Sequence, residues 1–162
     1  YAKTGGNYAA SLKAQKEAED NGYTQVLWLD GLERKYIEEV GTMNVFFVIG
    51  DEIITPALNG SILPGITRLS AIELLRSQGK VVTERSITID EVYDAHKKGV
   101  LKEAFGTGTA AVISPIGELN YGSNKIIINN NKTGNVAQEL YNALTQIQTG
   151  KAEDIFGWTH KV

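Results

Sequence analysis

The chain has 162 residues, of which 42% are hydrophobic and 22% charged, with a formal net charge of −3 and a pI of about 5.4. These values are typical of one globular domain, and the mild acidity disfavours nucleic acid or an anionic membrane as the main partner. The lack of cysteine excludes disulfides and cysteine-ligated zinc, and no apolar run reaches the roughly 20 residues of a membrane-spanning helix. With no redox demand and no export signature, a cytoplasmic location is expected.

The first half of the chain predicts one helix, several strands and a second helix. Residues 8–20 are good helix formers and end at Asn21-Gly22, a helix stop. Short apolar runs bounded by turn residues predict strands over 25–29, 36–39, 44–49 and 52–54. After Leu63-Pro64-Gly65, apolar residues at helical spacing predict a helix over 66–78.

The second half continues with a strand over 81–83 and a short helix that begins at a capping pattern, 88–91, and runs to 97. A buried strand is expected over 110–116, another strand over 125–129, a surface loop over 129–132 and an amphipathic helix over 135–148. Consecutive strands with short turns predict a mixed α/β (α+β) fold, whose largely antiparallel sheet curls around helices. No linker divides residues 1–162, so a single domain is expected.

Most familiar catalytic patterns are missing from the sequence. His96 and His160 lack metal-ligand spacing, so no metal site is expected, and there is no nucleophile elbow, Walker motif or dinucleotide fingerprint. Three kinds of segment remain: Lys3 before two glycines, the acidic pair Glu38-Glu39, and two turns suited to anions, at Gly65-Ile66-Thr67 and at Gly108-Thr109-Ala110.

Each of these segments alone has an ordinary explanation: a solvated lysine, an exposed acidic turn, a helix cap or a tight bend. Together they supply an imine-forming amine, an acid for a ring nitrogen and two phosphate cradles. Those are the groups that pyridoxal phosphate requires of a protein. The sequence therefore points to pyridoxal phosphate as a cofactor.

In their order and their amino-acid sequences, these segments resemble those of the branched-chain amino acid aminotransferases, which are class IV aminotransferases of fold type IV. The matching runs, in chain order, are KTGGNY at 3–8, IEEVGTMN at 37–44, LPGITR at 63–68 and FGTGTA at 105–110. The resemblance implies a curled sheet or pseudo-barrel with surrounding helices. It also implies reversible amino transfer between L-leucine, L-isoleucine or L-valine and 2-oxoglutarate.

The resemblance assigns roles to individual residues. Lys3 matches the catalytic lysine that binds the cofactor covalently, Tyr8 the partner of the ring oxygen, and Glu39 the partner of the pyridine nitrogen. Gly65, Ile66, Thr67 and Thr109 match the phosphate site. Thr42, Met43, Thr109 and Ala110 match residues that surround the substrate.

Enzymes of this kind carry a further N-terminal domain and are homodimers. The chain, which starts at Tyr1, is therefore interpreted as the C-terminal, cofactor-binding domain of a longer enzyme, inactive by itself. Two other readings stay open. One is a D-amino-acid aminotransferase or aminodeoxychorismate lyase of the same fold. The other is a domain that binds cofactor or a partner without catalysis.

Overall fold

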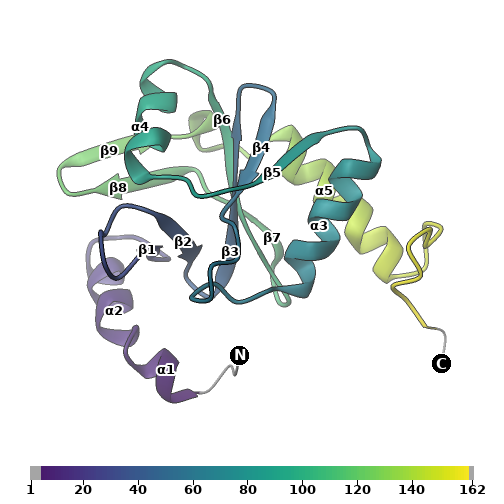
Figure 1. The fold of residues 1–162 in the computed structure, drawn as a ribbon, viewed down its shortest axis with the longest axis horizontal. Helices are drawn as coiled ribbons and strands as arrows, with labels where there is room; N and C mark the ends of the chain where they lie inside the picture. The colour runs from purple at the N-terminus through teal and green to yellow at the C-terminus, as the bar shows by residue number, and fades with distance from the viewer. Residues whose placement is uncertain (1–4, 161–162) are drawn as a thin grey trace.

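A computed structural model describes residues 5–160, with only the backbone described for Asn7 and Tyr8. Its helices are α1 (Gly5–Ala9), α2 (Leu12–Asp20), α3 (Ile66–Ser77), α4 (Ile89–Lys97) and α5 (Asn135–Gln148), with a 3-10 turn at Asn129–Asn131. Its strands are β1 (Leu27–Leu29), β2 (Ile37–Val40), β3 (Met43–Ile49), β4 (Glu52–Thr55), β5 (Val81–Glu84), β6 (Leu101–Gly108), β7 (Val112–Pro115), β8 (Glu118–Tyr121) and β9 (Asn124–Ile127). Figure 1 shows their arrangement.

Strand β3 is the centre of a seven-stranded sheet. One edge of β3 pairs with β6, which in turn pairs with β7, and the other edge pairs with β2 at its start and β4 at its end. All these ladders are antiparallel, and only β4–β5 is parallel. The predicted mixed, largely antiparallel sheet is thus confirmed. Within residues 5–160 no ladder closes the sheet, so pseudo-barrel describes it loosely.

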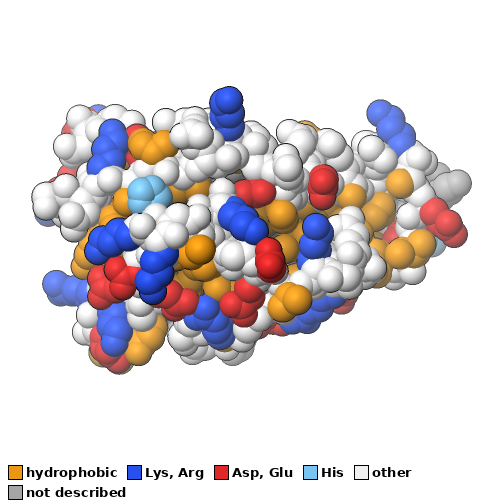
Figure 2. Space-filling view, turned by 90° about the horizontal axis from the view of Figure 1, so that it is seen from above, with side chains coloured by type: hydrophobic (Ala, Val, Ile, Leu, Met, Phe, Trp, Pro, Cys, Tyr) orange, Lys and Arg blue, Asp and Glu red, His pale blue; other side chains and the backbone are white. Residues whose placement is uncertain are grey.

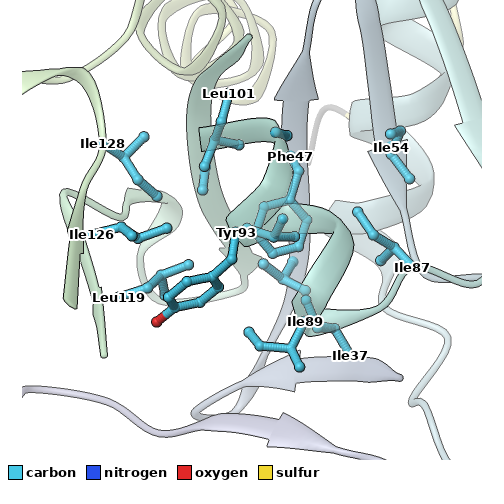
Figure 3. Close-up of a cluster of buried hydrophobic side chains, with 14 of the residues drawn as sticks. Ile37, Phe47, Ile54, Ile87, Ile89, Tyr93, Leu101, Leu119, Ile126 and Ile128 are labelled. Atoms are coloured by element: carbon cyan, nitrogen blue, oxygen red, sulfur yellow. The ribbon is translucent and has the colours of Figure 1, made fainter. Parts of the chain in front are cut away.

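The sheet has an apolar layer on each face. On one face, α4 and the β8–β9 hairpin enclose a cluster around Phe47 and Tyr93, which Figure 3 shows in detail. On the other face, α3 and α5 pack against Phe46 and Phe105, whose rings stack with centroids 5.3 Å apart. Burying aromatic rings on both sides of β3 and β6 fixes the positions of these two strands.

The strand expected over 110–116 is present but shorter, as β7, with only Ile113 buried, and strand β6 was not predicted. The structure has a turn at 109–111, between β6 and the shorter β7. Gly106 and Gly108 resembled turn residues, but they lie inside β6 because the side chain of Met43 packs over them. A Cβ would lie 2.9 Å from Met43 Cε at Gly106 and 3.0 Å from Met43 Cγ at Gly108. Glycine in a strand interior often marks such a close approach.

Two smaller differences concern the first helix and the β8–β9 hairpin. The helix expected over 8–20 is two helices, because residues 10 and 11 form a turn between α1 and α2. Strand β8 was also missed, and its partner β9 is shorter than the strand expected over 125–129. The helices α3, α4 and α5 begin and end within one residue of their predicted bounds.

On the face seen in Figure 2, basic and acidic side chains intermingle. Several exposed ions are paired, including Lys97 with Asp94 at 3.3 Å and Lys102 with Asp51 at 3.0 Å. Within residues 5–160, none of the helices has both the length and the apolarity needed to span a bilayer.

Asp30 organises the loop between β1 and β2. Its carboxylate accepts hydrogen bonds from four backbone N–H groups, those of Leu32, Glu33, Lys35 and Tyr36. The bonds from Lys35 and Tyr36 are the main cause that holds the pKa of Asp30 well below its usual value. The loop that leads into β2, and so to Glu39, therefore depends on an ionised carboxylate.

Asp30→Asn is expected to lower the thermal unfolding midpoint near neutral pH. Because the pKa is depressed in the folded state, the stabilisation is complete above the unfolded-state pKa of about 4 and is lost as pH falls through the folded-state value. Thermal unfolding of both proteins between about pH 7 and pH 2 should show the difference shrinking below about pH 4. Glu33→Gln, in the same loop, should leave the midpoint unchanged. A difference that does not vary with pH would contradict this role.

Candidate functional site

Two hairpin turns and one helix start meet at one end of the sheet. Asn44 pairs with Thr107 in the β3–β6 ladder, so the β2–β3 turn at 41–42 lies beside the β6–β7 turn at 109–111. Helix α3 begins at the same end, because Gly65 lies directly against the side chain of Asn44. In Figure 1 this is the lower end of β3.

Glu39 is held at this end by the strand pair β2–β3 and by the segment before α3. It pairs with Asn44 in the ladder, and its Oε1 accepts hydrogen bonds from Leu63 N at 3.1 Å and Asn44 Nδ2 at 3.5 Å. The neighbouring Glu38 accepts a bond from Ser61 Oγ at 2.6 Å. The half-buried Glu39 carboxylate is therefore oriented by the chain that leads to α3.

The start of α3 presents backbone donors that its own N-cap and first turn leave without a side-chain acceptor. Its N-cap, Gly65, is extended and makes no side-chain cap bond, and the first turn contains no acidic residue. By contrast, α4 is capped by Thr88, whose hydroxyl accepts a bond from Glu91 N at 3.0 Å. The first N–H groups of a helix and its dipole favour an anion such as phosphate. The α3 start can therefore hold one.

An ion pair between the buried Arg68 and the exposed Glu84 docks the first turn of α3. Arg68 is 3% exposed, and its Nη2 donates to Pro56 O and to Glu84 Oε2, each at 2.9 Å. Glu84 also binds Arg76, further along α3. Because a charge removed from water needs such partners, this network fixes where the start of α3 lies against the sheet.

Thr107 has an unsatisfied hydroxyl at the same end of β6. The residue is 1% exposed, and its Oγ1 has no hydrogen-bond partner among the described residues. Directly opposite residues of an antiparallel pair share a face, so Thr107 lies on the side of Asn44, Glu39 and α3. A buried hydroxyl that no described residue bonds, beside a helix start that no described side chain caps, fits an anionic group. The residues present therefore fit a phosphorylated cofactor.

The predicted site residues fall into four groups. Gly65, Ile66 and Thr67 form the α3 start near Glu39, while Thr42, Thr109 and Ala110 lie in the two neighbouring turns, where they are exposed. The side chain of Met43 covers Gly106 and Gly108 on the opposite face of the sheet from Glu39. Lys3 lies outside the described residues, and Tyr8 is described only as part of α1.

The sequence reasoning missed Thr107 as a site residue and gave Asn44 no role. Asn44 is the last residue of the IEEVGTMN run, and it is 6% exposed. An asparagine inside an apolar strand was the available signal, because a buried amide needs hydrogen-bond partners. For Thr107 the neighbouring glycines hid the strand that buries it.

Residues 1–119 match the family model described as amino-transferase class IV. The chain is 63% identical to "Branched-chain-amino-acid aminotransferase 2" of Bacillus subtilis (strain 168) over 99% of its own length. Among solved structures, the branched-chain amino acid aminotransferase of Escherichia coli superposes with a TM-score of 0.84 at 33% identity, over 99% of this chain and 50% of that one.

A further solved structure is a branched-chain amino acid aminotransferase complexed with N-(5'-phosphopyridoxyl)-L-glutamate. Its TM-score is 0.78 at 31% identity, over 97% of this chain and 49% of that one. The chain spans 44% of the length of the Bacillus subtilis relative, which is less than half. The likeness therefore covers nearly the whole of this chain and about half of each protein it resembles.

Proposed function

This chain belongs to the class IV aminotransferases, and we propose that it carries the cofactor-binding part of a branched-chain amino acid aminotransferase. The reaction would be reversible transfer of an amino group between L-leucine, L-isoleucine or L-valine and 2-oxoglutarate, with pyridoxal phosphate as cofactor. The supporting observation is a carboxylate, Glu39, fixed beside a helix start and a buried threonine hydroxyl, neither of which has a side-chain partner within residues 5–160.

Each end of this site would hold one part of the cofactor. Glu39 would keep the ring nitrogen protonated, and the N–H groups of Ile66 and Thr67, with Thr109, would bind the phosphate. Bound pyridoxal phosphate supplies an electron sink for the α-carbon of the amino acid. Lys3 would bind the cofactor covalently and, once released, its amine would move the proton at that carbon. Tyr8 would donate to the ring oxygen.

Other parts of the proposal concern the substrate and the assembly. Thr42, Thr109 and Ala110 lie in adjoining turns, which suits backbone recognition of a substrate carboxylate. Met43 is included in the substrate site through the family resemblance alone, because its side chain packs over Gly106 and Gly108 on the other face of the sheet. Residues 1–162 would act as a single domain within a longer, cytoplasmic, homodimeric enzyme. Size-exclusion chromatography with light scattering on the complete protein tests the dimer.

The covalent role of Lys3 is tested by adding pyridoxal phosphate to the complete protein and recording its visible absorption. A lysine amine has a pKa of about 10.4 in water and becomes reactive once it is placed in such a site. We expect an imine band in the wild type and none in Lys3→Ala, while Lys13→Ala, on α2, should keep the band. An unchanged band in Lys3→Ala would contradict the assignment.

The substrate class is tested by activity on three compounds. L-leucine with 2-oxoglutarate should be turned over, whereas D-alanine and aminodeoxychorismate should not. Turnover of D-alanine alone would favour a D-amino-acid aminotransferase, and turnover of aminodeoxychorismate alone would favour the lyase. Cofactor binding without turnover of any of them would favour a non-catalytic domain.

A further inference from the structure

Asn44 contacts both ends of the candidate cofactor site. Its Nδ2 donates to the backbone oxygen of Leu63 at 2.9 Å and lies 3.5 Å from Oε1 of Glu39. The same Glu39 oxygen accepts from Leu63 N at 3.1 Å. The backbone of Leu63 is therefore held on its N–H by the carboxylate and on its carbonyl by the carboxamide.

The side chain of Asn44 also lies against Gly65, the N-cap of α3. A Cβ added to Gly65 would lie 2.2 Å from Asn44 Oδ1 and 3.6 Å from Arg68 Cβ. The backbone of Gly65, with φ −70° and ψ 135°, is one that alanine adopts without strain. Close approach to the Asn44 carboxamide is therefore the physical reason that this position is glycine.

We propose that Asn44 is a positioning residue that sets the distance between the ring end and the phosphate end of the cofactor site. This inference rests on the proposed function. The side chain is 6% exposed, so it acts through Glu39 and the segment 63–65 rather than on the substrate. A rigid cofactor can bind both ends at once only when they lie at the right distance from each other. Holding that distance before the cofactor binds lowers the free-energy cost of binding.

If Asn44 has this role, its removal should weaken the binding of a ligand that uses both ends of the cofactor site more than the binding of a ligand that uses one end. Asn44→Ala should weaken binding of pyridoxal phosphate to the complete protein about tenfold, as expected for a lost buried hydrogen bond. Pyridoxal, which uses the ring end, and inorganic phosphate, which uses the helix start, should each lose less than about threefold. Absorption titrations give the first two affinities, and competition against pyridoxal phosphate gives the third.

Thr55→Val is the matched control. Thr55 is fully buried and its Oγ1 donates to Val45 O at 2.8 Å, so the variant removes a comparable hydrogen bond one residue away along β3. This hydrogen bond involves neither Glu39 nor the segment 63–65. Thr55→Val should lower the thermal midpoint without changing the ratio of pyridoxal phosphate to pyridoxal affinity. If Asn44→Ala changes all three affinities equally, as a merely structural residue would, the inference is overturned.

A double-mutant cycle tests the contact from the other side. Gly65→Ala alone should weaken binding of pyridoxal phosphate about tenfold, because its Cβ displaces the segment from Asn44. In the Asn44→Ala background the obstructing oxygen is gone, so Gly65→Ala should cost less than about twofold. Additive losses would overturn the inference even if one single variant folds poorly. Failure of the wild type to bind pyridoxal phosphate would instead remove the proposed function, and this inference with it.

Discussion

Glu39→Gln is expected to lower the transamination rate of the complete protein by roughly two to three orders of magnitude, as removal of one pre-organised electrostatic partner typically does. Glutamine has almost the shape of glutamate, and its amide oxygen can still accept the hydrogen bond from Leu63 N. What it lacks is the negative charge that would keep a ring nitrogen protonated. The loss should therefore appear in the catalytic rate and not in the fold.

The measurement is steady-state kcat with L-leucine and 2-oxoglutarate, accompanied by thermal unfolding. Glu38→Gln is the matched control, because Glu38 is the adjacent carboxylate and accepts its bond from Ser61 at the surface. We expect this control to change kcat by less than about threefold, within the range of surface substitutions. Equal losses in the two variants would mean that only the net charge of β2 matters, and Glu39 would lose its assigned role.

Local patterns predicted most of the helices and the first half of the sheet. The capping pattern at Thr88 is present as a bond from Glu91 N to the Thr88 hydroxyl. The strands expected over 44–49 and 52–54 are β3 and β4, joined by a tight turn with Gly50 at φ +60°. Such features depend on residues close in sequence, and so they are readable without the fold.

Strand β6 could not be read in this way. Its glycines mimic a turn, and their reason lies in Met43, more than 60 positions earlier in the chain. The alternation of β6 is visible only once its partner β3 is known, since the register sets which side chains share a face. Tertiary packing therefore overrode the local signal.

The candidate site likewise combines residues that local sequence indicates with residues that only the tertiary structure brings to light. The acidic pair Glu38-Glu39 and the α3 start were proposed from residue types and short runs, and the choice of Glu39 came from the family resemblance. Thr107 and the contacts of Asn44 were not proposed, because they arise from the pairing of two distant strands and from one close approach to Gly65. Charged groups and helix starts can be recognised from local sequence patterns, whereas the buried polar groups that align them cannot.

Phe105→Ala is expected to destabilise the protein by roughly 3–5 kcal/mol, the usual cost of emptying a large buried aromatic site. Phe105 is fully buried and stacks on Phe46 between the sheet and helices α3 and α5. Each ring lies two residues along its strand from a polar residue of the site, Thr107 on β6 and Asn44 on β3. The same packing that stabilises the fold thus also sets the register of the site.

Urea denaturation of the complete protein measures this loss, with Phe156→Ala as the control. Phe156 also stacks on a ring, that of Trp158 at 4.2 Å, but it is only half-buried near the end of the described chain. Its removal should cost well under half as much, because the vacated site opens to solvent. Phe105→Ala should in addition weaken binding of pyridoxal phosphate under conditions where the variant is still folded. If the folded variant binds pyridoxal phosphate with unchanged affinity, Phe105 contributes to the stability of the core and not to the geometry of the site.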